Sequence, residues 1–563
     1  MKNLSKHTIK EVINTSSENY SDNIALAQID GEKVSYKELK EKVERLSEFL
    51  KSRGIVKGDR VAILSENSIN WGISYLAITS MGAIAVPIMT EFQATEIKHI
   101  LMHSEAKAIF ISSKLFEKIE DIELDFLTNK ILLDNFSIIP DETKSDILKV
   151  AVRDGKIEFA KILDKALNYV GLKNEEVEED DLAALLYTSG TTGNSKGVML
   201  THKNIVYDAK ATIKLVGINQ TDVLLSILPL FHTIESTLGF LTPLMVGASI
   251  YYMKKPPTPT SLVAALGKVR PTVMLAVPLI IEKIYKGKIL KEINKKSITK
   301  KAYSFPLSRK IINKKAGKKL METFGGRMKM FCMGGAPLSN EVEQFLKEGK
   351  FPYTIGYGLT ETSPLVTGTP PERAKFGSCG DVLEGMEVKI DSSDPNKIEG
   401  EVLIKGPNVM QGYYKDEERT KEVFTDDGWF RSGDLGIIDK DGYLYIKGRS
   451  KNMILGANGK NIYPEEIESV INQQEFVAES VVIERNGKLV ALVHLDQEAM
   501  DDLLGTGKMS DSEARKLIDN ILKKIMEKTN TLVPSFSKIN FIELQPEPFI
   551  KTPTHKIKRF LYK

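Results

Sequence analysis

Helix and strand patterns alternate along the first part of the chain, and this alternation limits the folds open to it. The stretch KVSYKELKEKVERLSEFLKSRGIVKGDRVAIL, residues 33–64, predicts a helix followed by a strand. Ser35 and Glu38 form a capping box, apolar residues recur at helical spacing, and Gly54 ends the helix. Two further helix patterns come next, and each is followed in the sequence by an apolar strand pattern (AIAVPI and AKAIFIS). This order predicts an α/β fold with a largely parallel, doubly wound sheet.

The length of 563 residues exceeds what one hydrophobic core organises, so several folding units are expected. An acidic stretch at residues 174–181 is interpreted as a solvated linker ahead of the apolar strand DLAALLYT. From about Gly400 the sequence turns to short strand signals and tight turns, and after Pro464 it alternates between helix and strand patterns. A domain boundary is therefore expected near residues 447–451.

Composition excludes several classes of protein. A net charge of +3 argues against a dedicated nucleic-acid binder. The cysteines Cys332 and Cys379 are too few for a disulfide scaffold or a four-ligand zinc site, which favours a reducing cytoplasm. The first residues lack the apolar core of a signal peptide. The uncharged runs at residues 67–90 and 236–253 contain Gly, Ser, Thr and a proline, so we expect buried helix-then-strand segments rather than membrane spans.

A glycine-rich loop, YTSGTTGNSKG at residues 187–197, indicates phosphate binding without matching the best-known phosphate loop. A Walker A loop needs G-x-x-x-x-G-K-S/T, but here Ser195 stands at the second glycine and Gly197 at the hydroxyl. Its backbone amides, hydroxyls and Lys196 have the chemistry of an anion-binding nest. Taken alone, a loop of this composition is more often an ordinary turn.

Four further motifs change that interpretation. They are MGGAPL (333–338), YGLTETS (357–363), DDGWFRSGDLG (426–436) and KGRSKNMILGANGKNIYPEEIE (447–468). The first brings backbone close to a flat group, and the second places an aromatic ring, a hydroxyl and the Glu361 carboxylate within a few residues. In the third, Asp434 is suited to accept two hydrogen bonds from vicinal ribose hydroxyls, and in the fourth Arg449 stands at a strand end.

With these five motifs in this order, the chain closely resembles the adenylate-forming superfamily of acyl-CoA synthetases, nonribosomal peptide adenylation domains and luciferases. The resemblance covers nearly the whole sequence. It implies a large N-terminal domain at residues 1–447, with doubly wound sheets and a distorted β-barrel subdomain. It further implies a hinge at residues 448–451 and a small, mobile C-terminal α/β domain at residues 452–563.

The resemblance also implies which residues bind ATP. The loop around its β- and γ-phosphates would comprise Thr188, Ser189, Gly190, Thr191, Thr192, Gly193 and Lys196. The adenine and the α-phosphate would be contacted by Gly335, Ala336, Pro337, Gly356, Tyr357, Gly358 and Thr360. Glu361 would hold Mg²⁺, a hard cation that suits one carboxylate plus phosphate oxygens. Asp434 and Arg449 would hold the ribose.

The remaining implied roles concern the acid, coenzyme A and domain movement. His232 in LPLFHT would gate the carboxylate site. Lys556, in IKTPTHKIKRF, falls on the catalytic lysine of the family ending K-T-x-S/T-G-K-I-x-R, although His555 replaces its glycine. Lys451 aligns with the hinge about which the C-terminal domain rotates. The pantetheine tunnel would be lined by Gly459, Lys460 and Asn461.

The expected reaction is ATP-dependent activation of a carboxylic acid through an acyl-AMP intermediate to acyl-CoA, with release of AMP and pyrophosphate. A medium- or long-chain fatty acid is favoured by segments such as GFLTPLMVGAS and by a basic stretch at residues 285–329, with 15 Lys or Arg against two Glu. This stretch is a candidate contact with the inner face of a membrane or with an acidic partner; the alternative is a solvated helical face.

Other functions stay open at this point. The acyl group can pass to an acyl carrier protein instead of coenzyme A, and the acid can be aryl or otherwise non-fatty. A P-loop nucleotide hydrolase is disfavoured by the broken Walker spacing. A non-catalytic acyl-binding protein is disfavoured because Lys196, Glu361 and Lys556 are all present.

Overall fold

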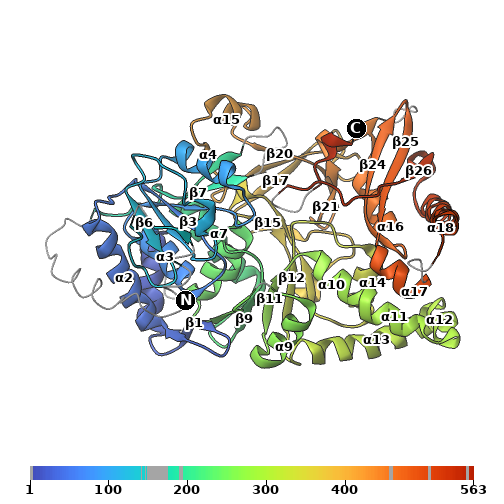
Figure 1. Cartoon of the computed structure of the whole chain (residues 1–563), viewed down its shortest axis with the longest axis horizontal. Helices are drawn as coiled ribbons and strands as arrows, with labels where there is room; N and C mark the ends of the chain where they lie inside the picture. The colour runs from blue at the N-terminus through green and yellow to red at the C-terminus, as the bar shows by residue number, and fades with distance from the viewer. Residues whose placement is uncertain are drawn as a thin grey trace. The chain divides into compact units, whose positions relative to one another are not determined.

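The computed structural model describes residues 4–140, 143–145, 148, 175–188, 195–255, 257–455, 461–504, 509–552 and 557–562 (Figure 1). The chain forms two compact units. The first comprises Met1–Ala336, Val342–Glu387 and Ile404–Phe430, and the second comprises Pro337–Glu341, Val388–Leu403 and Arg431–Lys563. The predicted α/β class is confirmed. The domain limits at residues 447 and 451 stay a prediction.

One seven-stranded sheet of the first unit has the strand order β19-β8-β7-β4-β3-β5-β6. The strands are β3 (Arg60–Leu64), β4 (Ile84–Pro87), β5 (Ala108–Ile111), β6 (Asn129–Leu132), β7 (Leu182–Thr188), β8 (Lys196–Thr201) and β19 (Gly412–Tyr413). From β7 to β6 the neighbours run parallel, while β8 and β19 are antiparallel additions. Because β4 and β5 lie on either side of β3, right-handed crossovers place the connecting helices α3 (Ile69–Ser80) and α4 (Ala94–Ser104) on opposite faces. The predicted doubly wound arrangement is confirmed.

A second seven-stranded sheet in the same unit has the order β13-β12-β11-β9-β10-β1-β2. Its strands are β1 (Ile24–Gln28), β2 (Lys33–Ser35), β9 (Val223–Ser226), β10 (Ser249–Tyr252), β11 (Val273–Ala276), β12 (Met330–Met333) and β13 (Tyr353–Ile355). All neighbours are parallel except β1 and β2. The loops that leave β12 and β13 therefore emerge at the same edge, where ligands of open α/β sheets bind. A small antiparallel sheet, β14 (Tyr357–Gly358), β15 (Leu365–Gly368) and β16 (Asp381–Val382), follows.

The first unit contains further α-helices. They are α1 (Ile9–Asn19), α2 (Tyr36–Ser52), α7 (His202–Val216), α8 (Thr242–Met245), α9 (Pro259–Val269), α10 (Pro278–Ile284), α11 (Lys291–Asn294), α12 (Ser297–Tyr303), α13 (Pro306–Thr323), α14 (Asn340–Glu348) and α15 (Glu417–Val423). The predicted capping box opens α2: Glu38 N–H donates to Ser35 Oγ over 3.2 Å, and Ser35 N–H donates to the Glu38 carboxylate over 2.8 Å. The apolar residues at helical spacing on α2 are buried.

The described part of the acidic stretch before β7 is mostly exposed, as a solvated linker would be, but it is also attached to the first unit. Asp181 forms an ion pair with Lys57 at 2.7 Å, Glu176 one with Lys6 at 2.5 Å, and Val177 is buried. Lysines that are distant in sequence neutralise the acidic side chains, so part of the stretch is fixed to the surface of the first unit.

The second unit contains two sheets of its own and a hairpin. The sheets are β17 (Glu387–Asp391), β18 (Gly400–Lys405), β20 (Phe430–Ile438) and β21 (Leu444–Arg449), and β24 (Val477–Arg485), β25 (Lys488–Leu495) and β26 (Phe541–Leu544). The hairpin is β22 (Ile454–Leu455) with β23 (Asn461–Ile462). The helices are α16 (Pro464–Asn472), α17 (Gln497–Leu504) and α18 (Asp511–Leu532). Among the described helices, none combines the length and the apolar composition needed to cross a bilayer.

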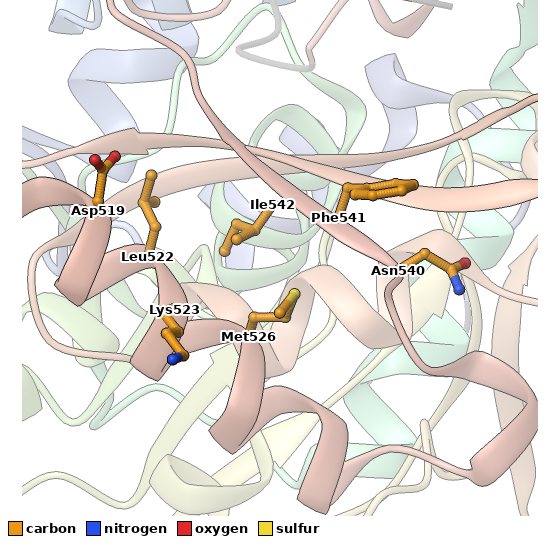
Figure 2. Close-up of a pocket in the computed structure, with 7 residues that line it drawn as sticks. All are labelled: Asp519, Leu522, Lys523, Met526, Asn540, Phe541 and Ile542. Atoms are coloured by element: carbon orange, nitrogen blue, oxygen red, sulfur yellow. The ribbon is translucent and has the colours of Figure 1, made fainter.

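A hollow of about 240 Å³ lies between α18 and β26 (Figure 2). Its lining residues are Asp519, Leu522, Lys523, Met526, Asn540, Phe541 and Ile542. None of them belongs to the five sequence motifs, so the hollow is not lined by residues expected to bind ATP.

Candidate active site

Tyr413 connects two of the residues expected to act on ATP. Lys196 opens β8, and β19 lies beside β8 with Tyr413 opposite Val198. The Lys196 ammonium nitrogen lies 4.7 Å from the centre of the Tyr413 ring. The Tyr413 hydroxyl donates a 2.9 Å hydrogen bond to Glu361 Oε1. A cation and a carboxylate far apart in sequence therefore contact the same tyrosine, the cation over its ring and the carboxylate at its hydroxyl.

The surroundings of Tyr413 hold it in place as a hydrogen-bond donor. Its backbone N–H donates to Thr420 Oγ1 over 2.9 Å, and Met410 N–H donates to the Glu361 carbonyl over 2.8 Å. Burial, followed by the nearby Glu361 carboxylate, raises the pKa of Tyr413 far above its ordinary value. The phenol thus stays protonated and directs its hydrogen to Glu361.

A buried polar pair fixes the backbone just after Glu361. Asn408 Nδ2 donates to Asp208 Oδ1 over 3.0 Å, and Leu365 N–H donates to Asp208 Oδ2 over 3.3 Å. Ser363 Oγ donates to the Asn408 carbonyl over 2.8 Å. Burial raises the pKa of Asp208, on α7, to about 8. This pair clamps the turn η4 (Thr360–Thr362) between α7 and the loop that leads to β19.

The loops expected to flank adenine leave neighbouring parallel strands. Gly356, which follows β13, donates its N–H to the carbonyl of Met333 at the end of β12 over 2.9 Å. Gly335 adopts a left-handed conformation with φ of 80°, and Gly335, Ala336 and Pro337 are exposed. Tyr357, after Gly356, is half-buried at the start of β14. In the first unit, Gly335, Ala336, Gly356 and Tyr357 thus lie on two loops that leave neighbouring parallel strands; their contact with adenine stays a prediction.

Gly358 has a structural reason to be glycine. A Cβ atom there would lie 1.8 Å from the carbonyl oxygen of Pro364, which no side chain can tolerate. This close approach lets β14 turn into the segment that carries Thr360 and Glu361.

The phosphate loop is described at its two ends. Thr188 and Lys196 are paired across the antiparallel strands β7 and β8, so the loop is the connection of a hairpin. Ser189, Gly190, Thr191, Thr192 and Gly193 lie outside the described residues.

His232 lies on the connection from β9 to the wide helical turn η2 (Ile234–Leu241). It is half-buried, its ring centre is 4.6 Å from that of Phe231, and its carbonyl accepts the N–H of Glu235 over 3.0 Å. A Cβ on Gly334 would meet Ile234 Cδ1 at 3.3 Å, so the His232 segment packs beside the loop that follows β12.

A buried acid lies directly behind the His232 segment. Glu235 accepts a 2.5 Å hydrogen bond from Ser226 Oγ, and burial raises its pKa to about 8. Asn67 Nδ2 donates both to Ser226 Oγ over 3.0 Å and to the carbonyl of Leu228 over 2.6 Å. These bonds fix the backbone of LPLFHT.

In the second unit, the two residues expected at the ribose are paired. Asp434 on β20 stands opposite Arg449 on β21, and Arg449 Nε lies 2.7 Å from Asp434 Oδ1. Asp434 is buried while nearly half of the Arg449 side chain is exposed. The ion pair with Arg449 holds the buried Asp434 carboxylate in one orientation.

The expected hinge follows immediately after Arg449. Lys451 is exposed in the short turn η6 (Ser450–Asn452). The turn is held on both sides: Ser450 Oγ donates to the Gly433 carbonyl over 3.1 Å, and Asn452 Nδ2 donates to Glu465 Oε1 over 2.6 Å. The lysine side chain itself projects from a single turn between a strand and a hairpin.

Of the residues expected to line the pantetheine tunnel, Asn461 is described. It lies on β23, where its Nδ2 donates to Glu399 Oε1 over 3.2 Å. Gly459 and Lys460 lie outside the described residues.

Lys556 and His555 also lie outside the described residues, but the chain on both sides of them is anchored. Lys551 Nζ pairs with Glu479 Oε2 at 2.5 Å before them. After them, the Arg559 guanidinium pairs with the buried Glu468 carboxylate on α16. Burial raises the pKa of Glu468, and the positive charge of Arg559 opposes that rise.

Glu361 is not part of a larger cluster of metal ligands. Within the described parts of the chain, no group of three or more His, Cys, Asp or Glu side chains is arranged to hold a metal ion. Only Oε1 of Glu361 accepts a side-chain hydrogen bond from a described residue. This donor set suits a cation that arrives with phosphate oxygens rather than a resident metal centre.

Comparison with known proteins assigns the family. The model of the AMP-binding enzymes matches residues 13–414, most of the chain. The chain belongs to the AMP-binding enzyme family. The model of the AMP-binding enzyme C-terminal domain matches residues 451–560. This AMP-binding enzyme is an AMP-forming acid–thiol ligase.

Individual relatives agree with this assignment. The AMP-binding enzyme is 30% identical to the peroxisomal long chain acyl-CoA synthetase 6 of Arabidopsis thaliana, over 91% of this chain and 77% of the relative. It is 26% identical to a chloroplastic long-chain-fatty-acid–[acyl-carrier-protein] ligase of the same plant, over 98% of this chain and 84% of the relative. In fold it is similar to ATP-bound MatB from Rhodopseudomonas palustris, with a TM-score of 0.75 at 24% identity, covering 99% and 98% of the two chains.

Proposed function

We propose that this AMP-binding enzyme activates a long-chain fatty acid with ATP and transfers the acyl group to coenzyme A. The observation that carries the proposal is the Lys196–Tyr413–Glu361 arrangement at the mouth of a glycine-rich hairpin. Support for the substrate class comes from the relatives, several of which are named long-chain acyl-CoA synthetases.

The chemistry follows from the poor leaving group of a free acid. A carboxylate oxygen attacks the α-phosphorus of ATP, the bond to the bridging oxygen breaks, and pyrophosphate leaves with that electron pair. The thiol of coenzyme A, after losing its proton, then attacks the acyl carbonyl, and AMP leaves. No protein nucleophile forms a covalent bond, so the protein contributes by positioning the reactants and neutralising charge.

In this proposal the phosphates lie in the hairpin loop. Lys196 and the loop from Thr188 to Gly193 hold the β- and γ-phosphates through the ammonium group, backbone amides and hydroxyls. Glu361 would hold Mg²⁺, which would neutralise phosphate charge, and a carboxylate outside any larger ligand cluster of the described residues fits this use. Tyr413 keeps Glu361 and Lys196 at a fixed separation, so that neither collapses onto the other.

The rest of the nucleotide would contact the loops at the sheet edge and the paired strands of the second unit. Gly335, Ala336 and Pro337 would flank one face of the adenine, and Tyr357, between Gly356 and Gly358, would stack on the other. Thr360 would contact the α-phosphate. The buried Asp434 carboxylate, oriented by Arg449, would accept hydrogen bonds from the ribose hydroxyls.

The two half-reactions would use different faces of the C-terminal region. Lys556 would contact the acid and the adenylate in the first step, while His232 gates the carboxylate site. Rotation about Lys451 would then remove Lys556 and bring the hairpin strand with Gly459, Lys460 and Asn461 to the pantetheine chain. The exposed position of Lys451 in a single turn supports its use as a hinge.

We also propose a cytoplasmic enzyme with peripheral membrane contact through residues 285–329. The excess of 15 Lys or Arg over two Glu in this stretch supports attraction to an anionic surface. The two free cysteines, Cys332 and Cys379, suit a reducing compartment.

A second candidate function transfers the acyl group to an acyl carrier protein. It is supported by the relative named as a ligase of that kind and by the basic stretch, which suits an acidic protein. The first half-reaction is the same in both candidates, and only the acceptor thiol differs.

A panel of acids tests the proposal. Acids from acetate to stearate, with benzoate as an aryl acid, are each incubated with ATP and Mg²⁺, and with coenzyme A or acyl carrier protein as acceptor. Pyrophosphate release and thioester formation are both measured. We expect the highest kcat/KM for long-chain acids with coenzyme A. Preference for benzoate or acetate contradicts the substrate class, and thioester formation only on the carrier protein contradicts the acceptor.

A further inference from the structure

Large apolar side chains are exposed on the most basic part of the chain. They lie on α12, on α13 and at the residue just before α13 (light green in Figure 1). The exposed fractions are 84% for Ile298, 65% for Phe305, 79% for Leu307 and 72% for Ile311. Scattered single apolar residues are common on protein surfaces, but four within so short a stretch indicate a binding surface.

One face of α13 is fixed to the first unit. Arg309 pairs with the Glu348 carboxylate at 3.0 Å, and the buried Asn313 donates to the same carboxylate over 2.7 Å. A Cβ on Gly317 would lie 2.2 Å from the carbonyl oxygen of Gly349, so the two backbones touch. This face anchors α13 against α14 and the residues that follow it.

Leu307 and Ile311 point away from that anchored face. They are one turn apart, and Leu307 is separated from Arg309 by about 200° around a helix of 3.6 residues per turn. The exposed Lys314 and Lys318 continue the same face along the helix. The outer face of α13 is therefore apolar in its first turns and cationic in the later ones, and a firmly packed inner face supports it.

Lysines surround the four apolar side chains. The exposed ones near them are Lys295, Lys296, Lys300, Lys301, Lys310, Lys314, Lys315, Lys318 and Lys319. We call the four apolar residues with these lysines the basic apolar ridge.

We propose that the basic apolar ridge inserts into the headgroup region of an anionic lipid bilayer. The inference deepens, and rests on, the membrane contact proposed above: it names the inserted side chains and their orientation. An interfacial element needs apolar side chains to bury and cations beside them to meet lipid phosphates. The outer face of α13 presents both, with Leu307 and Ile311 followed by Lys314 and Lys318. The lysine stems extend the apolar surface while their ammonium groups stay at the phosphates.

Other occupants fit the ridge less well. A second copy of the chain would bring lysines against lysines, which repel. An acidic carrier protein would pair with the lysines but would leave four large apolar side chains without an apolar counterpart. A bilayer satisfies both features, and it is also where a long-chain acid dissolves.

The test uses the full chain with vesicles of phosphatidylcholine alone or mixed with phosphatidylglycerol. Binding is measured by cosedimentation, and the test variant combines Ile298→Ser, Leu307→Ser and Ile311→Ser. Val56→Ser, at an exposed apolar residue outside the basic stretch, is the matched control. Because the replaced side chains are exposed, folding should be unaffected, which circular dichroism and the thermal midpoint verify.

We expect wild type and Val56→Ser to bind the anionic vesicles and to release from them as salt rises. The triple variant should bind at least about tenfold more weakly, because its apolar contacts are lost while its lysines remain. Lys310→Gln with Lys314→Gln and Lys318→Gln should also weaken binding to anionic vesicles.

Three results would overturn the proposal: no binding of wild type to anionic vesicles, equal binding of the triple variant, or ridge-dependent binding to acyl carrier protein with none to lipid. Pyrophosphate release from a water-soluble short-chain acid, without vesicles, is measured on the same preparations. Normal release without lipid binding counts against the ridge alone. Failure of wild type to release pyrophosphate with any acid counts against the proposed function instead.

Discussion

The Tyr413 hydroxyl donates a 2.9 Å hydrogen bond to Glu361 Oε1, and the Lys196 ammonium nitrogen lies 4.7 Å from the centre of the same tyrosine ring. β19 brings Tyr413 to this position by pairing with β8, the strand that Lys196 opens. A tyrosine outside the five motifs thus contacts both the proposed phosphate-binding lysine and the proposed magnesium-binding carboxylate.

Tyr413→Phe should slow adenylation with little change in folding. The ring stays beneath Lys196, but Glu361 loses a hydrogen bond to its charged form, which typically contributes about 1.5 to 3 kcal/mol. Because Glu361 is partly exposed, we expect the lower end, about a tenfold fall in the rate of pyrophosphate release, with a weaker apparent affinity for Mg²⁺. Rapid-quench measurements at several Mg²⁺ concentrations check this.

Tyr414→Phe is the matched control for that variant. Tyr414 is adjacent in sequence, but its ring packs against His103, 5.7 Å away between ring centres. Removal of the Tyr414 hydroxyl should leave the rate of pyrophosphate release unchanged. Equal rates of pyrophosphate release in Tyr413→Phe and Tyr414→Phe would show that the Tyr413 hydroxyl has no role in adenylation.

The raised pKa of Asp208 predicts that the stability of the protein depends on pH. Its folded-state pKa of about 8 lies above the ordinary value of 3.8, so the folded protein binds this proton more tightly than the unfolded chain does. The contribution of Asp208 is therefore favourable when the group is protonated, and the free energy of unfolding should fall as pH rises from about 4 to about 8. Urea unfolding of wild type and Asp208→Asn across this range measures the effect.

Asp208→Asn should flatten that part of the pH profile, since an amide does not titrate. The amide keeps one of the two oxygens that accept hydrogen bonds from Asn408 and Leu365, so the slope with pH, rather than the absolute stability, is the quantity to compare. A variant with the same pH slope as wild type would show that Asp208 is not the titrating group.

Much of the framework could be predicted from short stretches. The helix-then-strand pattern gave α3, β4, α4 and β5, because each element follows from local periodicity and end signals. The proximity of Asp434 and Arg449 could also be predicted, since both residues were expected to hold the ribose. The strand that ends at Thr188 was also predicted, from the apolar run DLAALLYT, whereas its antiparallel partner beginning at Lys196 was not.

The residues that sequence reasoning missed depend on long-range pairing. Tyr413 acts only because β19 joins the edge of a sheet whose next strand lies some two hundred positions earlier in the chain. Asp208, in a helix of mixed composition, reads as a surface acid until Asn408 and Leu365 are seen to surround it. Glu468 could be placed near a helix start, but its buried partner Arg559 lies near the far end of the sequence.

Arg559→Ala should destabilise the second unit and misplace Lys556, three residues before it. The substitution leaves the Glu468 carboxylate buried without its cation, which typically lowers the free energy of unfolding by about 3 kcal/mol. Adding Glu468→Gln should restore much of the stability, because no unpaired charge remains, without restoring the adenylation rate. Chemical unfolding and pyrophosphate release of the single and double variants separate the two effects. Recovery of both together would show that Arg559 has a purely structural role.

Lys556→Ala should separate the two half-reactions. Adenylation should fall by about 10² to 10³, the usual loss for one charge-stabilising donor. Thioester formation from a preformed acyl-adenylate should stay comparatively intact. Equal loss in both half-reactions would contradict the assignment.

Lys451→Pro should have the opposite effect, because proline restricts the backbone at the proposed hinge. Acyl-adenylate should accumulate while thioester formation stalls. Normal acyl-CoA production by this variant would place the hinge elsewhere.

The most direct measurement follows the oxygen atoms of the acid. A long-chain acid labelled with heavy oxygen in its carboxylate is incubated with the enzyme, ATP, Mg²⁺ and coenzyme A, and the products are examined by mass spectrometry. Attack on the α-phosphorus predicts one labelled oxygen in AMP, with unlabelled pyrophosphate. Label in orthophosphate, with ADP as the nucleotide product, would contradict the acyl-adenylate reaction.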